Sequence, residues 1–269
     1  MDIVGFMRDC PLIAVQVVNY RTRRYLERCV DTVVSDLEGS SLAFEINLLE
    51  NASGEDLGDL AARVANCRVF TAAKNLGFGG GHNFLAGQTD AQYLLILNPD
   101  VELLFPDTVR RLLLPVAGAA RVKAAGPRLL TVDGQAQPYD HGRLHGLRAE
   151  IALKGGHSYW RQTETRQEVA WVSGAAMLIE RAAFESIGGF DDKLFLYKED
   201  EDLCLRLRDA GGQVIYEPGA AVRHLGSVVA NHHQELAVAS RYYFSKHFQD
   251  ARSRRAYAAV HRSLAYVRL

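Results

Sequence analysis

The sequence has few of the features that mark several protein classes. Its 4 cysteines (Cys10, Cys29, Cys67 and Cys204) form no CxxC pair, which excludes a zinc knuckle or a redox motif and favours buried, reduced thiols. The formal net charge of −1 lacks the basic excess of a general nucleic-acid binder. No apolar run approaches the ~18 residues of a membrane span, and the start of the chain has no signal-peptide pattern. We therefore expect a cytoplasmic protein that binds no nucleic acid.

Apolar runs alternate with segments of helical spacing in the first half of the chain. Residues 12–18 are apolar almost without interruption, which is typical of a strand buried on both faces of a parallel sheet. We expect further strands at 43–49, 67–70, 93–97 and 122–125, and helices at 22–35, 55–64 and 106–117. This alternation predicts a doubly wound, mostly parallel α/β sheet. Ligands of such sheets bind where the strands end.

The second half of the sequence is less regular. Residues 138–168 are polar and predict a long, partly irregular insertion, a kind of segment that often carries function. We expect a strand over 169–179, a helix near 202–210, strands at 213–216 and 220–223, and a C-terminal helical segment from about residue 234. No internal repeat or low-complexity tract is present, so the pattern indicates one domain with a helical C-terminal segment.

Two polar motifs follow apolar runs of the first half. Asn98-Pro99-Asp100-Val101-Glu102 comes directly after the run 93–97, and a carboxylate there suits a hard divalent cation that bridges to substrate phosphates. An ordinary turn explains Asn-Pro-Asp equally well. The segment 75–83 is rich in glycine and opens a short helix, which would let the backbone approach a phosphate closely. A flexible surface turn is the alternative.

Glycine is absent from residues 19–23, the turn after the first expected strand. The segment 75–83 also follows neither the P-loop nor the GxGxxG spacing. These absences argue against a dinucleotide-binding site.

Four consecutive acids, residues 199–202, open the helix expected near 202–210. Acids are common in a first helical turn because they suit the helix dipole. The apolar lead-in Phe195-Leu196-Tyr197 places the first acids near an apolar wall, where a carboxylate can be tuned as a general base. His224 ends a short strand, and it is a candidate metal ligand only if it meets Asp100 in space.

Read in order, these segments resemble family 2 glycosyltransferases, especially the bacterial rhamnosyltransferase-like branch. The resemblance runs from about Leu12 to His247. The matching segments are residues 17–20, 50–53, 75–83, 97–102, 126–130, 173–177, 187–191, 197–206 and 224–227.

The resemblance implies a GT-A fold and an inverting transfer that depends on Mg²⁺ or Mn²⁺. The domain would cover residues 1–233, with a nucleotide-binding half at about 11–130 and an acceptor-side half at about 131–233, followed by a helical extension over 234–269. Asp100 and His224 match the metal ligands. Asp200 matches the catalytic base, with Glu199 beside it. The partners would be a nucleotide diphosphate sugar and a glycan, glycolipid or other small acceptor.

The resemblance also implies a set of residues that bind the nucleotide sugar. Asn19 and Tyr20 would lie near the base and ribose, Glu50 at the pyrimidine edge, and Gly174 near the sugar and diphosphate. The remaining expected contacts are Asn75, Gly77, Gly79, Asn98 and Asp100. The family usually has Asp where this chain has Glu50, and a small or amide residue where it has Arg21. We expect dTDP-L-rhamnose as donor, with a UDP-sugar as the alternative.

Two other functions remain open alongside transfer. One is a non-catalytic protein that binds nucleotide sugars. The other is a nucleotidyltransferase, which would need a phosphate loop rich in glycine, arginine and lysine that residues 19–24 do not supply.

The C-terminal segment 251–269 carries arginines and no acid, and its apolar side chains fall on one helical face. It suits an anionic membrane, a second subunit or the chain's own domain.

Overall fold

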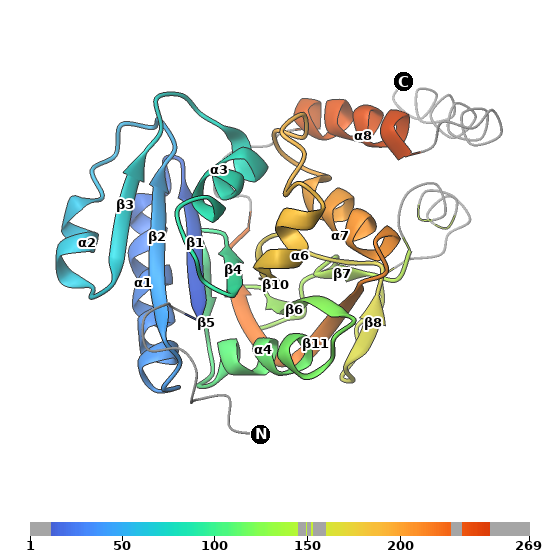
Figure 1. Cartoon of the computed structure of the whole chain (residues 1–269), viewed down its shortest axis with the longest axis horizontal. Coiled ribbons are helices and arrows are strands. Elements are labelled where there is room, and N and C mark those ends of the chain that lie inside the picture. Colours follow the sequence, from blue (N-terminus) through green and yellow to red (C-terminus); the bar gives the residue numbers. More distant parts are fainter. Residues whose placement is uncertain (1–11, 145–148, 150–151, 153–159, 227–232, 248–269) are drawn as a thin grey trace.

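The computed structural model describes residues 12–144, 149, 152, 160–226 and 233–247. A nine-stranded sheet forms its centre, in the order β3-β2-β1-β4-β10-β6-β11-β5, and β8 pairs with β11 (Figure 1). Its strands are β1 (Ile13–Asn19), β2 (Phe44–Glu50), β3 (Cys67–Thr71), β4 (Tyr93–Leu97), β5 (Val101–Leu103), β6 (Val122–Leu130), β8 (Gln167–Val169), β10 (Ala176–Glu180) and β11 (Gln213–His224). Strands β7 (His141–Gly142) and β9 (Trp171–Val172) pair separately.

The sheet is mostly parallel, as predicted. Strands β1, β2, β3, β4, β6 and β11 share one direction, whereas β5, β8 and β10 run against it. The four parallel strands at one side come from the first half of the chain. Their carboxyl ends therefore meet at one edge of the sheet, which is where the sequence predicts the ligand.

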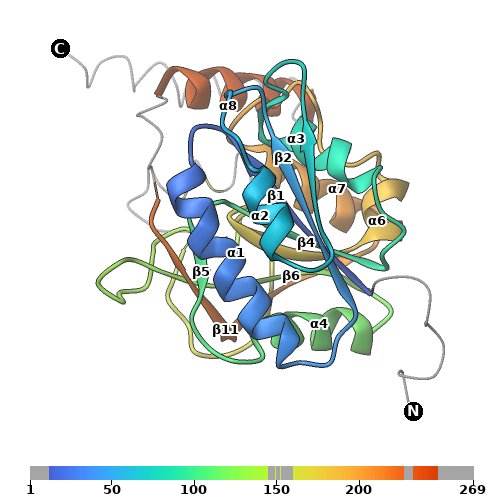
Figure 2. The same ribbon diagram turned by 90° about the vertical axis from the view of Figure 1, so that its left-hand side faces the viewer.

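Helices cover both faces of the sheet (Figure 2). The clusters of buried side chains place α1 (Arg23–Glu38), α2 (Gly58–Arg63) and α4 (Thr108–Gly118) on one face and α3 (Gly77–Ala86), α6 (Arg181–Ser186) and α7 (Glu199–Asp209) on the other. In β1, Ile13, Val15 and Val17 face the first cluster, while Ala14 faces the second. The apolar run at 12–18 is uninterrupted because both of its faces are buried.

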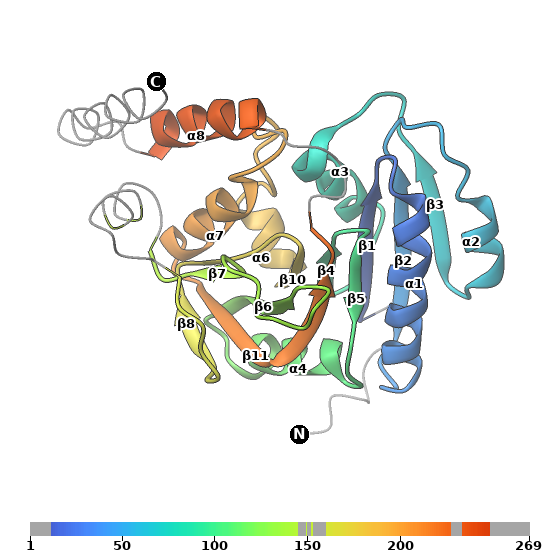
Figure 3. The same cartoon turned by 180° about the vertical axis from the view of Figure 1, so that it is seen from behind.

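Two strand expectations in the second half are wrong in detail. The strand expected at 169–179 is interrupted, because residues 173–175 separate β9 from β10. The strands expected at 213–216 and 220–223 are one strand, β11, whose register shifts between Glu217 and Ala221. Pro218 and Gly219 lie at that shift, since proline donates no backbone hydrogen bond and glycine tolerates the bend. Figure 3 shows that β11 is a sharply bent strand.

The C-terminal helix α8 (His233–His247) begins close to the expected position and packs beside α7. Tyr243 and Phe244 of α8 form a buried cluster with Leu205 of α7, and Figures 1 and 3 both show α8 outside α7. The segment 251–269 and residues 1–11 lie outside the described residues. The division of the chain into halves and an extension stays a prediction. In the part of the chain that is described, no helix has the length and apolarity that crossing a membrane requires.

Helix α3 begins within the glycine-rich segment, and two of its glycines allow close packing. A Cβ on Gly81 would lie 2.7 Å from Cγ2 of Val18 on β1, and one on Gly79 would lie 2.7 Å from Cβ of Phe190. A Cβ on Gly80 would meet nothing closer than 3.4 Å. The glycine run therefore serves partly to bring α3 against the sheet.

This packing predicts opposite results for two neighbouring substitutions. Gly81→Ala should lower the free energy of unfolding by about 1–3 kcal/mol because the methyl group overpacks the contact with Val18. Gly80→Ala, the matched control, should raise it by up to about 1 kcal/mol because alanine is the better helix former. Urea unfolding of both variants measures the difference, and equal stabilities would contradict this account of the close contact.

Candidate functional site

A cavity of about 370 Å³ lies at the carboxyl edge of the sheet. Its polar lining comes from Tyr20, Thr22, Asn51, Asn75, Asn98, Asp100, Gln137 and His224, and its apolar wall from Val18, Phe78, Pro99, Phe195, Leu196 and Tyr197. Most of the polar residues follow the ends of β1, β2, β4 and β11. The cavity is therefore at the place that the strand order predicts.

Asp100 and His224 meet in this cavity. Oδ1 of Asp100 lies 3.5 Å from Nε2 of His224, and Oδ2 of Asp100 accepts a hydrogen bond of 2.9 Å from the backbone N–H of Gly226. Pairing of β5 with the end of β11, which sets His224 opposite Val101, brings the two segments together. The condition set for His224 as a candidate metal ligand is met.

The geometry of this pair fits a divalent cation. Two ligand atoms at about 2.1 Å from one cation lie about 3 Å or slightly more from each other, close to the observed separation. Gln137 Oε1 is 3.0 Å from Nδ1 of His224, so Nδ1 is the protonated nitrogen and Nε2 keeps its lone pair. In the same tautomer, Nδ2 of Asn98 lies 3.2 Å from Nε2 as a donor.

The electrostatics of the pair also favour a ligating histidine. Burial lowers the pKa of His224, and the charge of Asp100 opposes that shift only in part. A neutral imidazole is the form that binds metal. Among the described residues no group of three His, Cys, Asp or Glu side chains converges here or elsewhere. Two protein ligands suit Mg²⁺ or Mn²⁺, which complete their shell with phosphate oxygens and water.

Asp200 and Glu199 begin α7, beside the apolar wall of the cavity. The N–H groups of Gly174 and Glu201 donate to the two oxygens of Asp200 over 3.0 and 2.8 Å. Burial raises the pKa of Asp200. Burial and the neighbouring charge of Asp200 raise the pKa of Glu199 well above its usual value, and Oε2 of Glu199 has no hydrogen-bond partner among the described residues. A carboxylate that is held in place and desolvated is suited to act as a general base.

The glycine-rich segment contributes to the cavity at its first residues only. Asn75 and Gly77 line it, whereas Gly79 packs against Phe190. Asn51 fixes this corner, because its Oδ1 accepts from the N–H of Leu76 and its Nδ2 donates to Oδ1 of Asn75. The expectation that Gly79 approaches a phosphate has no support in this placement.

Three other expected ligand contacts are not among the residues that line the described cavity. Asn19 is fully buried, donates to Glu55 and accepts from Thr22. Glu50 accepts from the N–H groups of Ser53 and Gly54 within its own turn. Gly174 holds Asp200, and a Cβ there would lie 3.1 Å from Cζ of Phe78. Asn19 thus holds Thr22 of the lining, whereas the hydrogen-bond partners of Glu50 and Gly174 lie outside the lining.

Three polar residues of the cavity lining, Thr22, Asn51 and Gln137, were not singled out from the sequence. Asn51 directly follows β2, so the rule of strand ends could have identified it. Gln137 lies in an irregular stretch after β6, and nothing in the sequence shows that it reaches His224.

Comparison with known proteins places these residues in a known family. A family model described as "Glycosyltransferase like family 2" matches residues 11–244. An N-acetylglucosaminyl-diphospho-decaprenol L-rhamnosyltransferase of Mycobacterium tuberculosis is 30% identical over 240 residues, covering 79% of this chain and 76% of the relative. The rhamnosyltransferase WbbL of Escherichia coli K12 is 38% identical over 81 residues, which is 30% of this chain and 27% of the relative.

Solved structures with the same fold share little sequence with this chain. A mannosyltransferase of Pyrobaculum calidifontis, solved with GDP-Man and Mn²⁺, has a TM-score of 0.64 at 15% identity, covering 94% of this chain and 71% of its own. GalNAc-T7, solved with UDP, GalNAc and Mn²⁺, has a TM-score of 0.62 at 17% identity, covering 81% of this chain and 44% of its own. These likenesses show the fold, which is GT-A.

The raised pKa of Glu199 predicts how stability changes with pH when its charge is removed. A carboxyl whose pKa is higher in the folded state costs stability once the pH exceeds its unfolded pKa, because folding then opposes its ionisation. Glu199→Gln should therefore raise the melting temperature at pH 8 and leave it unchanged near about pH 3.5, below the unfolded value.

Glu185→Gln, which removes an exposed carboxyl paired with Arg181, is the control and should show little difference between the two pH values. A Glu199→Gln variant that is less stable than wild type at pH 8 would contradict this reading of the buried acid.

Proposed function

We propose the reaction of this chain from one established premise: the chain belongs to glycosyltransferase family 2 and is a glycosyltransferase. We infer that it moves L-rhamnose from dTDP-L-rhamnose to an acceptor hydroxyl, with a divalent cation and with inversion at the anomeric carbon. The observation that carries the proposal is the meeting of Asp100 with a neutral His224 in a cavity whose wall leads into Asp200. The structures with Mn²⁺ support a divalent cation in general terms.

Asp100 and His224 would hold the cation together with the diphosphate of the donor. Contacts within the chain orient both side chains, since the N–H of Gly226 donates to Asp100 and the amide oxygen of Gln137 accepts from His224. When bound, the cation neutralises the charge that develops on the departing diphosphate. Asn98 lies beside His224 and Asn75 lines the same cavity, and both would contact the nucleotide sugar.

Asp200 would take the proton of the attacking hydroxyl. Its two backbone hydrogen bonds orient the carboxylate, and burial raises its pKa, which makes it a stronger base than an exposed aspartate. Glu199 lies next to it as the second acid of the pair. Asp100 is the sole carboxylate of the described cavity lining and is proposed to hold the cation. The Glu199–Asp200 pair beside the wall is proposed to act as base, which leaves no further carboxylate in this part of the chain as the nucleophile of a double displacement. A single attack inverts the anomeric centre.

The donor and the acceptor are proposed from the relatives and the cavity. The apolar wall at Phe195 and Leu196 suits the methyl group of a 6-deoxyhexose such as rhamnose. The Mycobacterium relative is named for rhamnosyl transfer to an N-acetylglucosaminyl diphosphate lipid, and we propose a glycan or glycolipid acceptor of this kind. A UDP-sugar is the alternative donor, and binding without turnover is the alternative function.

The place of the reaction is likewise a proposal. A cytoplasmic enzyme that touches the inner face of the membrane would meet both the donor and a lipid-linked acceptor. The basic segment 251–269 suits an anionic lipid surface or a second subunit.

The metal proposal predicts a loss of cation-dependent donor binding. Asp100→Ala and His224→Ala should each weaken Mn²⁺-dependent binding of dTDP by at least about tenfold, because each removes one of two protein ligands. Glu102→Gln is the matched control, since that carboxylate pairs with Arg223 and should leave the affinity unchanged. Calorimetry with and without Mn²⁺ measures the effect. Full activity in excess chelator would contradict the proposed dependence on a divalent cation.

The base proposal predicts a separation of turnover from binding. Asp200→Asn keeps the shape of the side chain but removes its basicity, so kcat should fall by about 10²–10⁴-fold while donor affinity changes little. Asp209→Asn, at the exposed end of the same helix, should behave as wild type. Near-normal turnover of the Asp200 variant would refute the role of Asp200 as the base and leave Glu199 as the candidate.

The stereochemical proposal is tested on the first product formed. With dTDP-β-L-rhamnose and a short-chain N-acetylglucosaminyl diphosphate lipid, inversion should give an α-linked rhamnoside that proton NMR identifies. A β-linked product would contradict the single attack. Faster transfer from UDP-sugars than from dTDP-L-rhamnose would replace the donor and leave the mechanism in place.

A further inference from the structure

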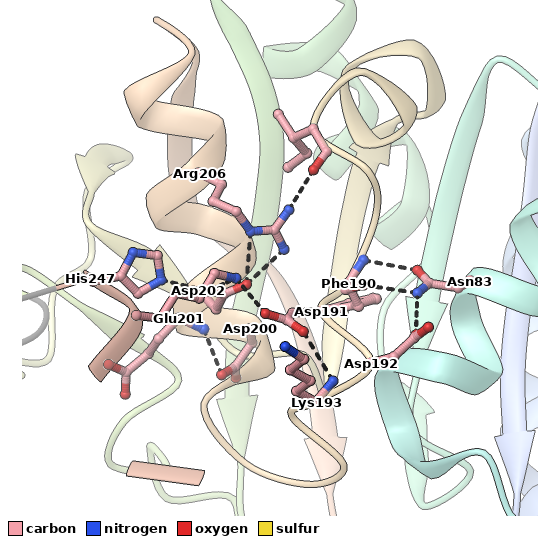
Figure 4. Close-up of polar contacts among 12 residues, drawn as sticks. Asn83, Phe190, Asp191, Asp192, Lys193, Asp200, Glu201, Asp202, Arg206 and His247 are labelled. Atoms are coloured by element: carbon pink, nitrogen blue, oxygen red, sulfur yellow. Dashed lines mark hydrogen bonds and ion pairs between the residues drawn. The ribbon is translucent and has the colours of Figure 1, made fainter. Parts of the chain in front are cut away.

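Helix α8 makes two kinds of contact with the part of the molecule that carries Asp200. Tyr243 and Phe244 bury their rings against Leu205 of α7. One turn further along α8, Lys246 and His247 reach the acidic start of α7. Figure 4 shows His247 directed at Asp202, with Asp200 and Glu201 close by on the same helix.

Lys246 joins two carboxylates from different segments. Its Nζ lies 2.6 Å from Oδ2 of Asp191 and 2.7 Å from Oδ1 of Asp202. Asp191 also accepts a hydrogen bond of 2.8 Å from Tyr242 of α8. Asp202 is fully buried and is surrounded by Arg206, Lys246 and His247.

The charge of Asp202 is permanent under ordinary conditions. Burial alone raises its pKa, but the hydrogen bonds from His247 and Lys246, together with the charges of Arg206 and Lys246, outweigh that effect and bring the pKa to about 2. A buried carboxylate of this kind needs its cationic partners, because an unpaired buried charge is strongly unfavourable. The contact between α8 and α7 is thus held by the pairing of Asp202 with Lys246 and His247, and loss of these partners would leave a buried charge uncompensated.

Asp191 and Asp202 lie at the two ends of one stretch of the candidate site. Between them, Phe195, Leu196 and Tyr197 form the apolar wall of the cavity. Asp200 lies two residues before Asp202. Movement of either end of this stretch would therefore displace the wall or the candidate base.

The backbone of this stretch is strained just before α7. Tyr197 and Lys198 have φ values of 72° and 68°, in the left-handed region that non-glycine residues rarely adopt. Such conformations persist only where the surroundings enforce them. On the α3 side, Oδ1 of Asn83 accepts a hydrogen bond from the N–H of Phe190, and Nδ2 of Asn83 donates one to the C=O of Phe190. On the other side the cationic groups of α8 hold Asp191 and Asp202.

We propose that Lys246 is a positioning residue for sugar transfer, which holds the cavity wall and Asp200 in place by joining Asp191 to Asp202. The inference rests on the proposed role of Asp200 as the base. By this inference α8 is needed for catalysis, independently of the role of the segment 251–269.

The test compares Lys246→Met with Lys246→Arg in the full chain. Lys246→Met keeps the length and apolar stem of the side chain but removes the charge, and kcat should fall by about 10- to 100-fold through misplacement of Asp200. Binding of dTDP with Mn²⁺ should stay within about twofold, since Asp100 and His224 are untouched. Lys246→Arg should restore most of kcat because it can still span both carboxylates.

Arg241→Met is the matched control. It removes a cation from the exposed face of the same helix, and kcat should remain that of wild type. Hydrogen exchange gives a readout that does not depend on activity: amides within 191–202 should exchange faster in Lys246→Met than in Lys246→Arg or Arg241→Met.

The outcomes separate this inference from the proposed function. Wild-type kcat and unchanged exchange in Lys246→Met would overturn the inference, and so would a loss of dTDP binding that parallels the loss of kcat. Asp200→Asn measured beside it tests the proposed function. If Asp200→Asn is inactive and Lys246→Met fully active, only the positioning role fails; if Asp200→Asn is active, the role of the base fails first.

Discussion

The candidate site depends on the contact between Asp100 and His224. The two residues are far apart in the sequence, and they meet because the bent strand β11 pairs with β6 along its length and with β5 at its end. Just after His224, the N–H of Leu225 donates a hydrogen bond to the backbone oxygen of Asp100, and the N–H of Gly226 donates one to its Oδ2. The bend at Pro218 and Gly219 therefore has a functional consequence: a straight β11 would not deliver His224 to the carboxyl edge of the parallel strands.

Local patterns in the sequence were enough to predict the fold and part of the site. The uninterrupted apolar runs at 12–18 and 93–97 indicate strands buried on both faces, and the rule of strand ends then leads to Asn98 and Asp100. The apolar lead-in at 195–197 indicated the first acids of α7 as candidate bases, and the family resemblance selected Asp200 among them. These predictions rest on contacts within a few residues, which periodicity and composition report directly.

Contacts across the chain were beyond such patterns. Residues 75–83 indicate a glycine loop, but Gly79 and Gly81 serve the packing of α3 on Phe190 and Val18. Glu50 is an acid at a strand end, yet its Oε1 accepts hydrogen bonds from the N–H groups of Ser53 and Gly54 in the following turn. The partners Gln137 of His224 and Lys246 of Asp202 come from irregular or remote segments, and only the folded chain brings them to the site.

The central claim is that Asp100 and His224 bind one divalent cation with the diphosphate of the donor. Anomalous diffraction from crystals grown with Mn²⁺ and dTDP tests it most directly. The account predicts a manganese peak about 2.1 Å from an oxygen of Asp100 and from Nε2 of His224, with diphosphate oxygens completing the shell. A nucleotide bound in the cavity with no manganese between these two side chains would contradict it.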